Sequence, residues 1–486
     1  MSAILVMENA RRWPLRSNGA EVVSARDYLV GDHWSERRAL RVYNFCRTYG
    51  YQTLGYYVSL LAAARGHRPI PTVETLQDLR LGPVVRLVSE ELDEVIQRSF
   101  SRLKRSSFDL SVYFGRNLAR RYEPLARKLY EQFPVPLLRA TFERRGREWH
   151  LSSVRPIATS EVPESHWEFV IDQAEQHFTR PSRLSRAKRT YRYDLAILTN
   201  PGAKNLPSDK QALRRFIKAA RDLAINAELI EQDDASDIAE YDALFIREAT
   251  YVNHPTYRLS RRAASEGLIV IDDPISILRC TNKVFLAELF ARCSIPHPKT
   301  IVAHDDNVDS IADEVGLPCV LKRPDSAFSQ GVIRVDNLED LRKHAKTFLE
   351  DSELVVAQAF TPSDFDWRIG VLGREALFAC RYHMAKGHWQ IVAPGPRGGR
   401  RYGKVEPVPL EQVPRECLAV GVRAASLIGD GFYGVDIKEI DGRFLVMEVN
   451  DNPNVDSGLE DGAIGDKLYA KVMEWFRQRL DSRGST

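Results

Sequence analysis

Short apolar runs on either side of an amphipathic segment open the second part of this chain of 486 residues. "YDLAILTN", from Tyr193, is an unbroken apolar run typical of a buried parallel strand. "SDKQALRRFIKAARDLAI" has helical spacing with Ser208 as its expected N-cap, and "AELIEQ" and "YDALFIRE" predict two further strands. Strand, helix and strand in this order predict a small α/β unit, which we place at residues 190–274.

Residues 275–482 predict a second unit in which strands outnumber helices. Thr281 is the expected cap of a helix that ends at Pro296 and Pro298. Strands are then predicted at "CVLKRP", "LVVAQAF", "RIGVLG", "EALFACRYHM" and "WQIVA", and helices at "CLAVGVRAASLIG" and "AIGDKLYAKVMEWFRQRL". The fold class indicated for both units is α/β, with mixed helices and sheets.

The stretch "GVDIKEIDGRFLVMEVNDNPN" reads as a hairpin with its turn at Asp441-Gly442. Side chains alternate along a strand, so Glu448 and Asn450 share one face. Asp436 lies twelve residues before Glu448, and the two can be direct partners only across an odd loop or a β-bulge. Given that register, two carboxylates and one amide converge on one point.

Asp436, Glu448 and Asn450 are therefore candidate ligands for Mg²⁺, which prefers oxygen ligands and binds substrate phosphates. The alternative is a surface hairpin with solvated charges. That alternative explains poorly why Glu448 lies between the apolar "FLVM" and Val449, because a carboxylate in such a strand needs a partner. We favour the metal site.

Two lysines are candidates for binding a polyphosphate on that metal. Lys322 ends the strand "CVLK", and Lys283 lies in the first turn of the helix after Thr281. The loop "RPDSAFSQGV" follows Lys322 and contains Ser326, Ser329 and Gly331, whose small size leaves backbone N–H groups free to bind phosphate. No Walker motif is present.

The order Lys283, Lys322, a loop with Gly331, "VVAQAF", "DWR", Asp436 and then "EVN" resembles ATP-grasp enzymes, in particular the RimK-like carboxylate–amine ligases. The resemblance covers roughly residues 195–480. It implies an ATP-grasp fold at 275–482, preceded by a small α/β pre-ATP-grasp domain at 190–274. The N-terminal residues 1–180 resemble the RLAN domain that is fused to some of these ligases, and they indicate no chemistry of their own.

The resemblance also implies a role for each matching residue. Lys322 would hold the α- and β-phosphates of ATP with help from Lys283, and two Mg²⁺ ions, or Mn²⁺ in their place, would bind to the hairpin ligands. The remaining roles are an adenine hinge at Gln358, Ala359 and Phe360, a ribose contact at Asp366, an acyl-phosphate contact at Arg368 and a phosphoryl contact at Arg381.

The sequence departs from the family's pattern around the expected substrate site. The family's "F-R-S-N" segment is "WQIV" here, around Trp389 and Gln390, and the basic glycine-rich loop "PGPRGGRRYG" follows. Arg400 and Arg401 are candidates for binding a substrate carboxylate, although a solvated loop explains them equally well. Arg247, which ends the strand "ALFIR", is a further candidate because substrates bind beyond strand ends in α/β units.

Composition and charge bear on two other functions, the binding of nucleic acid and the binding of a membrane surface. A net charge of +3 and 44% hydrophobic residues give no argument for nucleic acid or a membrane surface. We interpret the basic stretch "RPSRLSRAKRTYRY" as a solvated linker, and the six scattered cysteines as the reduced thiols of a cytoplasmic protein. No apolar run is long enough to span a bilayer. A homo-oligomer is compatible with the sequence.

The function expected from these residues is ATP-dependent formation of an amide or peptide-like bond. A carboxylate would attack the γ-phosphate of ATP, and an amine would attack the resulting acyl phosphate. The expected partners are small carboxylate and amine substrates, including amino acids or a peptide or protein terminus. Three alternatives remain: a glutamate ligase acting on a protein terminus, an ATP-grasp kinase that phosphorylates a hydroxyl, and a binding module with a decayed site.

Overall fold

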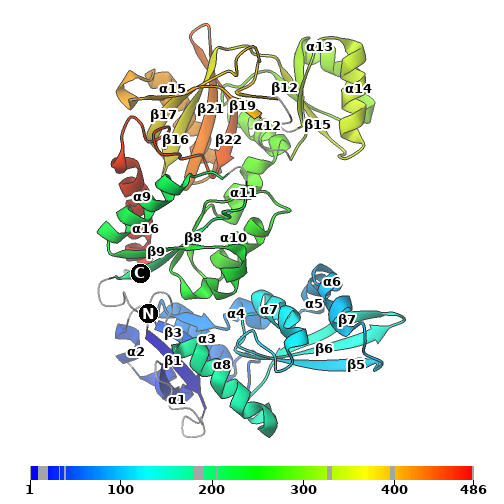
Figure 1. The fold of residues 1–486 in the computed structure, drawn as a ribbon, viewed down its shortest axis with the longest axis vertical. Coiled ribbons are helices and arrows are strands. Elements are labelled where there is room, and N and C mark those ends of the chain that lie inside the picture. The colour runs from blue at the N-terminus through cyan, green and yellow to red at the C-terminus, as the bar shows by residue number, and fades with distance from the viewer. Residues whose placement is uncertain are drawn as a thin grey trace.

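The computed structural model describes residues 2–8, 20–31, 33–37, 40–179, 191–203, 206–325, 331–394 and 400–483. Figure 1 shows three regions stacked along the long axis, with the N-terminal residues at one end and the most strand-rich part at the other. The linker stretch expected at residues 180–193 lies mostly outside the described residues. In the described part of the chain, no helix has the length and apolar character needed to cross a membrane.

The N-terminal region contains two sheets. A parallel sheet of order β2-β1-β3-β4 is followed by an antiparallel sheet of order β5-β6-β7. The strands are β1 Ser2–Met7, β2 Ala20–Ser24, β3 Leu40–Asn44, β4 Arg68–Ile70, β5 Ser107–Tyr113, β6 Leu137–Arg145 and β7 Glu148–Pro156. The helices are α1 Ala25–Val30, α2 His33–Glu36, α3 Leu54–Ala64, α4 Val73–Asp78, α5 Gly82–Glu91, α6 Asp93–Phe100, α7 Glu123–Gln132 and α8 Trp167–Thr179.

The middle region is a four-stranded parallel sheet of order β11-β10-β8-β9. Its strands are β8 Tyr193–Leu198, β9 Ile225–Ile230, β10 Ala243–Ile246 and β11 Ile269–Ile271, and its helices are α9 Lys210–Asp222 and α10 Pro255–Ser265. The strand–helix–strand prediction is confirmed. The cap of α9 is Asp209, which accepts a hydrogen bond from the Ala212 N–H, and not the expected Ser208, which is buried.

The third region contains a four-stranded sheet of order β12-β15-β13-β14 and a five-stranded antiparallel sheet of order β20-β17-β16-β21-β22. The strands of the first sheet are β12 Thr300–Ala303, β13 Cys319–Lys322, β14 Val332–Val335 and β15 Val355–Ala359. Those of the second are β16 Phe365–Leu372, β17 Glu375–His383, β20 Val405–Val408, β21 Phe432–Ile440 and β22 Arg443–Asp451. A small hairpin pairs β18 Val392–Pro394 with β19 Arg400–Tyr402.

Helices cover both sheets of the third region and connect it to the middle region (Figure 1). They are α11 Pro274–Thr281, α12 Lys283–Arg292, α13 Ile311–Val315, α14 Leu338–Leu349, α15 Arg415–Ile428 and α16 Asp466–Arg483. The C-terminal α16 returns to the middle region, where Leu468, Tyr469 and Phe476 share one buried core with the middle sheet and the five-stranded sheet. This shared core fixes the middle region against the strands that carry the candidate metal ligands.

The N-terminal region contacts the middle region through two arginines at the amino ends of its strands. Arg41 on β3 donates a hydrogen bond of 2.8 Å to the Glu240 carbonyl, and Arg68 on β4 bonds to the Tyr241 carbonyl. Arg68 also pairs with Asp242, directly before β10, at 3.3 Å. The contact therefore lies at the amino edge of the middle sheet, away from the carboxyl ends of its strands.

Candidate active site

The hairpin formed by β21 and β22 has the register that a shared metal site requires, with Asp436 directly opposite Glu448. Asp441 and Gly442 both have positive φ, 50° and 74°, as expected of a two-residue hairpin turn. Asp436 pairs with Glu448, whereas Ile437 pairs with Val446, so Met447 is the extra residue of a β-bulge. The expected bulge is thus present, five residues from the turn and next to Glu448 itself.

The candidate metal ligands share one face of the five-stranded sheet, because residues paired across strands point the same way. Asp436 is paired with Glu448 on one side and with Arg368 on the other. Arg368 bonds to both carboxylate oxygens of Asp436, with 3.0 Å from its Nη2 to Oδ2, and Asn450 Nδ2 lies 3.3 Å from the same Oδ2. The sequence-based prediction that these three ligand side chains converge is confirmed.

Gly434 makes room for this arrangement. A Cβ atom at Gly434 would lie 3.1 Å from Cδ of Arg368 and 3.0 Å from Cβ of Pro453. A side chain at this position would require Arg368 or Pro453 to shift by a few tenths of an ångström. This close approach is the physical reason for a glycine at the first position of "GVDI".

The two candidate lysines come from the other side of the site. Lys322, at the end of β13, donates a hydrogen bond of 2.7 Å to Oε1 of Gln358 on β15, and Gln358 Nε2 donates to Thr300 Oγ1 at 2.9 Å. Lys283 is the first residue of α12, whose cap is Asn282 and not the expected Thr281. Thr281 instead ends α11, where its hydroxyl donates to the Ile277 carbonyl.

One pocket brings both sides together. It is lined by both lysines and Gln358 from one side and by Met447 and Glu448 of β22 from the other, together with Leu286, Ala287, Phe290, His297, Thr300 and Val356. The pocket is thus apolar at one part of its wall and charged at another. Such a lining suits a ligand with a flat apolar ring and an anionic tail.

The charges of the site depend on one another. Burial alone would raise the pKa of Glu448, but Lys283, Lys322 and Arg368 outweigh burial and lower it, so Glu448 is ionised. Burial raises the pKa of Asp436 to about 6, against the opposing effect of Arg368. Burial also lowers the pKa of Lys322 to about 8, although Glu448 opposes this shift.

The donor set fits a hard divalent cation. Glu448 and Asp436 supply carboxylate oxygens and Asn450 an amide oxygen, which are the ligands that Mg²⁺ accepts in proteins while it keeps several waters. Within the described ranges, no three His, Cys, Asp or Glu side chains are grouped so as to hold a metal. A cation here would therefore rely on the Asn450 amide and on the ligand's own oxygens, as expected for a metal that binds together with a polyphosphate.

Lys438 belongs to the site and was missed in the sequence. It is buried on β21, and its ammonium donates 2.6 Å hydrogen bonds to Asp366 Oδ1 and Ser363 Oγ. It also lies close enough to Lys322 to oppose the charging of that lysine. Its position two residues after Asp436, on the same face of a strand, was a usable signal.

Arg381 does not join the cluster, and the role expected for it at the phosphoryl group is not supported. It pairs with Trp367 on β16, one residue out of phase with Arg368, so it lies on the opposite face of the sheet. There its guanidinium lies 4.8 Å from the Trp367 ring centroid and 5.1 Å from that of Phe365, and Glu406 is 3.6 Å away. Arg381 packs behind the site, on the sheet face that α15 covers.

Arg247 is likewise not available for the expected substrate carboxylate. Its side chain is fully buried, and it donates hydrogen bonds to Ser208 Oγ, Asn452 Oδ1 and the carbonyls of Pro207 and Pro453. Burial lowers its pKa to about 10, which still leaves it charged at neutral pH. These hydrogen bonds hold the end of β10 against Asn452 and Pro453, which follow β22.

The expected adenine hinge is only partly supported. Gln358 lines the pocket, but the Ala359 N–H donates to the Lys299 carbonyl and the Phe360 N–H to the Pro318 carbonyl. Neither N–H is therefore directed at a ligand. Asp366, the expected ribose contact, is buried and bound to Lys438.

The loops expected around the substrates are described only in part. Gly331 has a positive φ of 67°, and its carbonyl accepts a hydrogen bond from the Arg323 N–H. Ser326 and Ser329 lie outside the described residues. Arg401 is exposed on β19, and the neighbouring Arg400 belongs to the same strand, but its side chain is not described.

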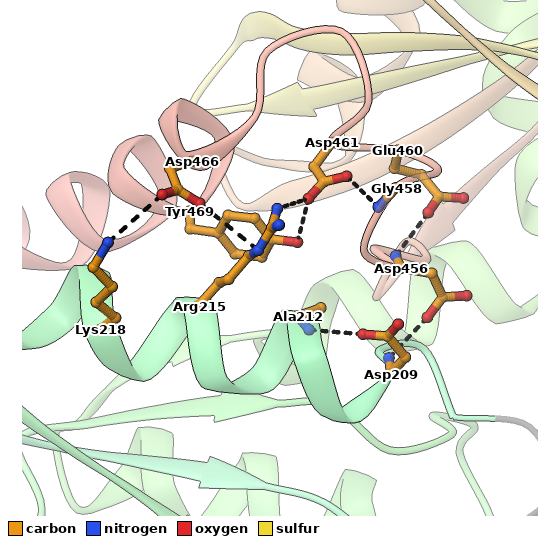
Figure 2. A network of polar contacts seen from close by, with 10 residues as sticks. All are labelled: Asp209, Ala212, Arg215, Lys218, Asp456, Gly458, Glu460, Asp461, Asp466 and Tyr469. Atoms are coloured by element: carbon orange, nitrogen blue, oxygen red, sulfur yellow. Dashed lines mark hydrogen bonds and ion pairs between the residues drawn. The ribbon is translucent and has the colours of Figure 1, made fainter.

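The segment after β22 is anchored by a polar network, which Figure 2 shows between α9, α16 and the loop of residues 456–465. Asp461 accepts hydrogen bonds from Arg215 on α9 and Tyr469 on α16, and Asp456 accepts one of 2.8 Å from the Asp209 N–H. Glu460 accepts a hydrogen bond from Tyr382, whose ring centroid lies 4.9 Å from the Arg368 guanidinium. The network thus connects the middle region to the arginine beside Asp436.

The lowered pKa of Lys322 predicts how nucleotide affinity changes with pH. Below pH 8 the ammonium is charged and attracts phosphate, and above pH 8 it becomes neutral. ATP affinity should therefore fall about tenfold between about pH 7 and about pH 9, as one proton must be taken up on binding. Nucleotide titrations at several pH values, with Lys322→Arg as the permanently charged control, measure this. A wild-type affinity that stays constant across this range would contradict the assignment.

Comparison with known protein families agrees with this geometry. Residues 280–475 match the RimK-like ATP-grasp domain, and residues 25–173 match the RimK-like ATP-grasp N-terminal domain, RLAN. The chain carries a RimK-like ATP-grasp domain. The resemblance seen in the sequence is thereby confirmed, including the N-terminal part, and the fold of the third region is the ATP-grasp fold.

Named relatives of the ATP-grasp protein are ligases. The α-aminoadipate–LysW ligase LysX of Saccharolobus solfataricus is 28% identical over 222 residues, which cover 44% of this chain and 77% of LysX. A probable α-L-glutamate ligase of Legionella pneumophila strain Corby is 26% identical over 299 residues, which cover 59% of this chain and 95% of that ligase. A RimK domain ATP-grasp protein of Sphaerobacter thermophilus superposes with a TM-score of 0.45 at 17% identity. The superposition covers 58% of this chain and 98% of the Sphaerobacter chain. The protein is an ATP-dependent ligase of the class that forms carbon–nitrogen bonds.

Proposed function

We propose that the protein joins a carboxylate to the amine of an amino acid, or of a peptide or protein terminus, through an acyl phosphate, with release of ADP and phosphate. One observation carries this proposal. Lys283 and Lys322 face the carboxylate of Glu448 across a single pocket, next to the face where Asp436, Asn450 and Arg368 meet. A nucleoside triphosphate requires cations from one side and metal-binding oxygens from the other.

Different residues of the site would bind different parts of ATP. The apolar wall with Phe290 and Met447 would hold the adenine, and Lys322 and Lys283 would bind the α- and β-phosphates. Asp436, Glu448 and Asn450 would hold Mg²⁺, two ions or Mn²⁺ in their place, which neutralises phosphate charge and orients the γ-phosphoryl group. Asp366 would contact the ribose, with its orientation fixed by Lys438.

Arg368 is the residue that we assign to the chemical step. A carboxylate oxygen of the donor attacks the γ-phosphorus, the bond to the β-phosphate oxygen breaks, and ADP leaves. The amine nitrogen then attacks the acyl carbon, the carbon–oxygen bond to phosphate breaks, and the amine loses a proton. Charge develops on phosphoryl oxygens in both steps. Asp436 holds Nε and Nη2 of Arg368, and the remaining N–H groups of the guanidinium would supply donors for those oxygens.

The relatives' names favour amino acids as substrates over a hydroxyl acceptor. LysX is named for α-aminoadipate, and the Legionella protein for glutamate. These are related dicarboxylic amino acids, so glutamate and aminoadipate are the first compounds to test as either partner. The apposed lysines and metal ligands argue against a decayed binding module.

A screen of carboxylates and amines, singly and in pairs, tests the proposal. The readouts are ADP release and the mass of the product. We expect ADP release to require the carboxylate, and stable product and phosphate to require the amine as well. ADP release accompanied by a phosphorylated hydroxyl compound and no amide would establish the kinase alternative instead.

A further inference from the structure

The carboxyl edge of the middle sheet carries a group of polar side chains that the nucleotide site does not use. Asn200 follows β8, Gln232 follows β9 and Glu248 follows β10. In parallel α/β sheets, ligands bind in the crevice outside the carboxyl ends of the strands. The N-terminal region contacts the opposite, amino edge of this sheet, where Arg68 pairs with Asp242.

Glu248 is held firmly by one oxygen and lacks a partner on the other. Its side chain is only 3% exposed. Oε1 accepts hydrogen bonds from Gln232 Nε2 at 2.8 Å and Asn200 Nδ2 at 3.2 Å. Oε2 is buried and meets no hydrogen-bond donor in the described part of the chain. A buried carboxylate oxygen without a donor costs free energy, so its persistence calls for a ligand group that donates.

The group adjoins the strand that carries the metal ligands. Asn452 Nδ2 donates to the backbone carbonyl of Glu248, and Thr250 Oγ1 donates to Asp451 Oδ2 at 2.6 Å. Asp451 and Asn452 are the next two residues after Asn450. A small substrate bound at Glu248 would therefore lie near the end of β22, the strand that carries Glu448 and Asn450.

The local charges select the kind of group that can bind. The neighbouring arginine, Arg247, donates to Ser208, Asn452, Pro207 and Pro453, and it shares the buried core side of β10 with Phe245, whose ring lies 5.2 Å from its guanidinium. Glu248 contacts other residues, Gln232 and Asn200, which follow β9 and β8. The group thus offers Glu248 Oε2 as an acceptor without a donor, while both amides are committed to Oε1 and the Asn200 oxygen accepts from the Gly202 N–H. A carboxylate oxygen in this state suits an ammonium ion, which has only donors.

We propose that Glu248 binds the ammonium group of an amino-acid substrate, with Asn200 and Gln232 as positioning residues. The inference rests on the proposed ligase function, because it assumes that one substrate is an amino acid. It names a binding residue and a chemical class of ligand, whereas the ATP-binding residues say nothing about the substrate. An amino acid should bind, and its analogue without the amino group should not.

The test compares wild type with Glu248→Gln in the full-length protein. The probes are the proteinogenic amino acids and aminoadipate, each paired with its des-amino analogue, such as L-glutamate with glutarate. Calorimetric titration in the presence of ADP and Mg²⁺ measures the affinities. In wild type the amino acid should bind about 10- to 100-fold more tightly than the analogue, and in Glu248→Gln this preference should disappear. ADP affinity should not change.

Glu228→Gln is the matched control. Glu228 lies on β9 of the same sheet and accepts a hydrogen bond from Tyr241, but it is not at the carboxyl edge. This variant should keep the wild-type preference. If Glu248→Gln proves unfolded by circular dichroism, the charge-retaining Glu248→Asp variant and the wild-type comparison of each probe pair still test the inference.

The failures of the two proposals are distinguishable. Unchanged amino-acid preference in Glu248→Gln, with ADP release intact in wild type, would overturn the role of Glu248 and leave the ligase in place. Equal wild-type affinity for every amino acid and its analogue, or no binding of any probe, would overturn it as well. Absence of ADP release with all substrate pairs would instead count against the ligase reaction, whatever the binding data show.

Discussion

Replacing Glu448 with glutamine is expected to lower ATP-dependent turnover by at least about 10²-fold. Glutamine keeps the size of the side chain but removes the charge that Lys283, Lys322 and Arg368 stabilise in the wild-type protein. The Mg²⁺ requirement should shift to much higher concentration, since one of two carboxylate ligands is lost. Steady-state ADP release measured against Mg²⁺ concentration gives both effects.

Glu439→Gln is the control for the Glu448 experiment. Glu439 lies on the same hairpin, is exposed, and accepts a hydrogen bond from the Trp367 indole that a glutamine can also accept. This variant should behave as wild type. Near-normal, Mg²⁺-dependent activity in Glu448→Gln would remove the basis of the metal assignment.

Replacing Arg368 with lysine is expected to slow the formation of ADP in a single turnover by about 10²- to 10³-fold. Lysine keeps the positive charge beside Asp436 but cannot reproduce the two parallel hydrogen bonds that arginine makes. ATP affinity should change little, because the lysines on the other side of the pocket bind the α- and β-phosphates. Rapid-quench measurement of ADP beside an equilibrium titration of ATP separates the two effects.

Arg381→Lys supplies the comparison for Arg368→Lys. Both arginines lie on adjacent strands, but Arg381 lies on the opposite face against Trp367 and Phe365. We expect Arg381→Lys to keep the wild-type rate of ADP formation. A slow Arg381→Lys variant beside a normal Arg368→Lys variant would reverse the two assignments.

The local parts of this site could be predicted from the sequence. Alternation placed Glu448 and Asn450 on one face, and the spacing of Asp436 from Glu448 required the bulge that occurs at Met447. These features depend on a single hairpin, in which the turn sets the register. Lys322 and Gln358 could be placed for a similar reason, because each lies in a short, strongly apolar strand.

The other parts depend on contacts that no local pattern encodes. Whether Arg381 faces the site depends on how β16 and β17 pair, and a shift of one residue would have reversed it. Arg247 ends a strand, as a substrate-binding residue would, but Asn452 and Pro453, about 200 residues away in the chain, occupy its donors. Alternation places Lys438 on the face of Asp436, but its partner Asp366 lies 72 residues away in the chain, and that pairing has no local signal.

The most direct test of the central claim follows an oxygen atom. The donor carboxylate identified by the screen is prepared with oxygen-18 in its carboxyl group and incubated with the protein, ATP, Mg²⁺ and the amine. Because the carboxylate oxygen that attacks the γ-phosphorus later leaves with it, we predict that each inorganic phosphate released carries one oxygen-18, measured by mass spectrometry or by the phosphorus NMR isotope shift. Unlabelled phosphate formed together with the amide product would contradict an acyl phosphate and with it the account given of the site.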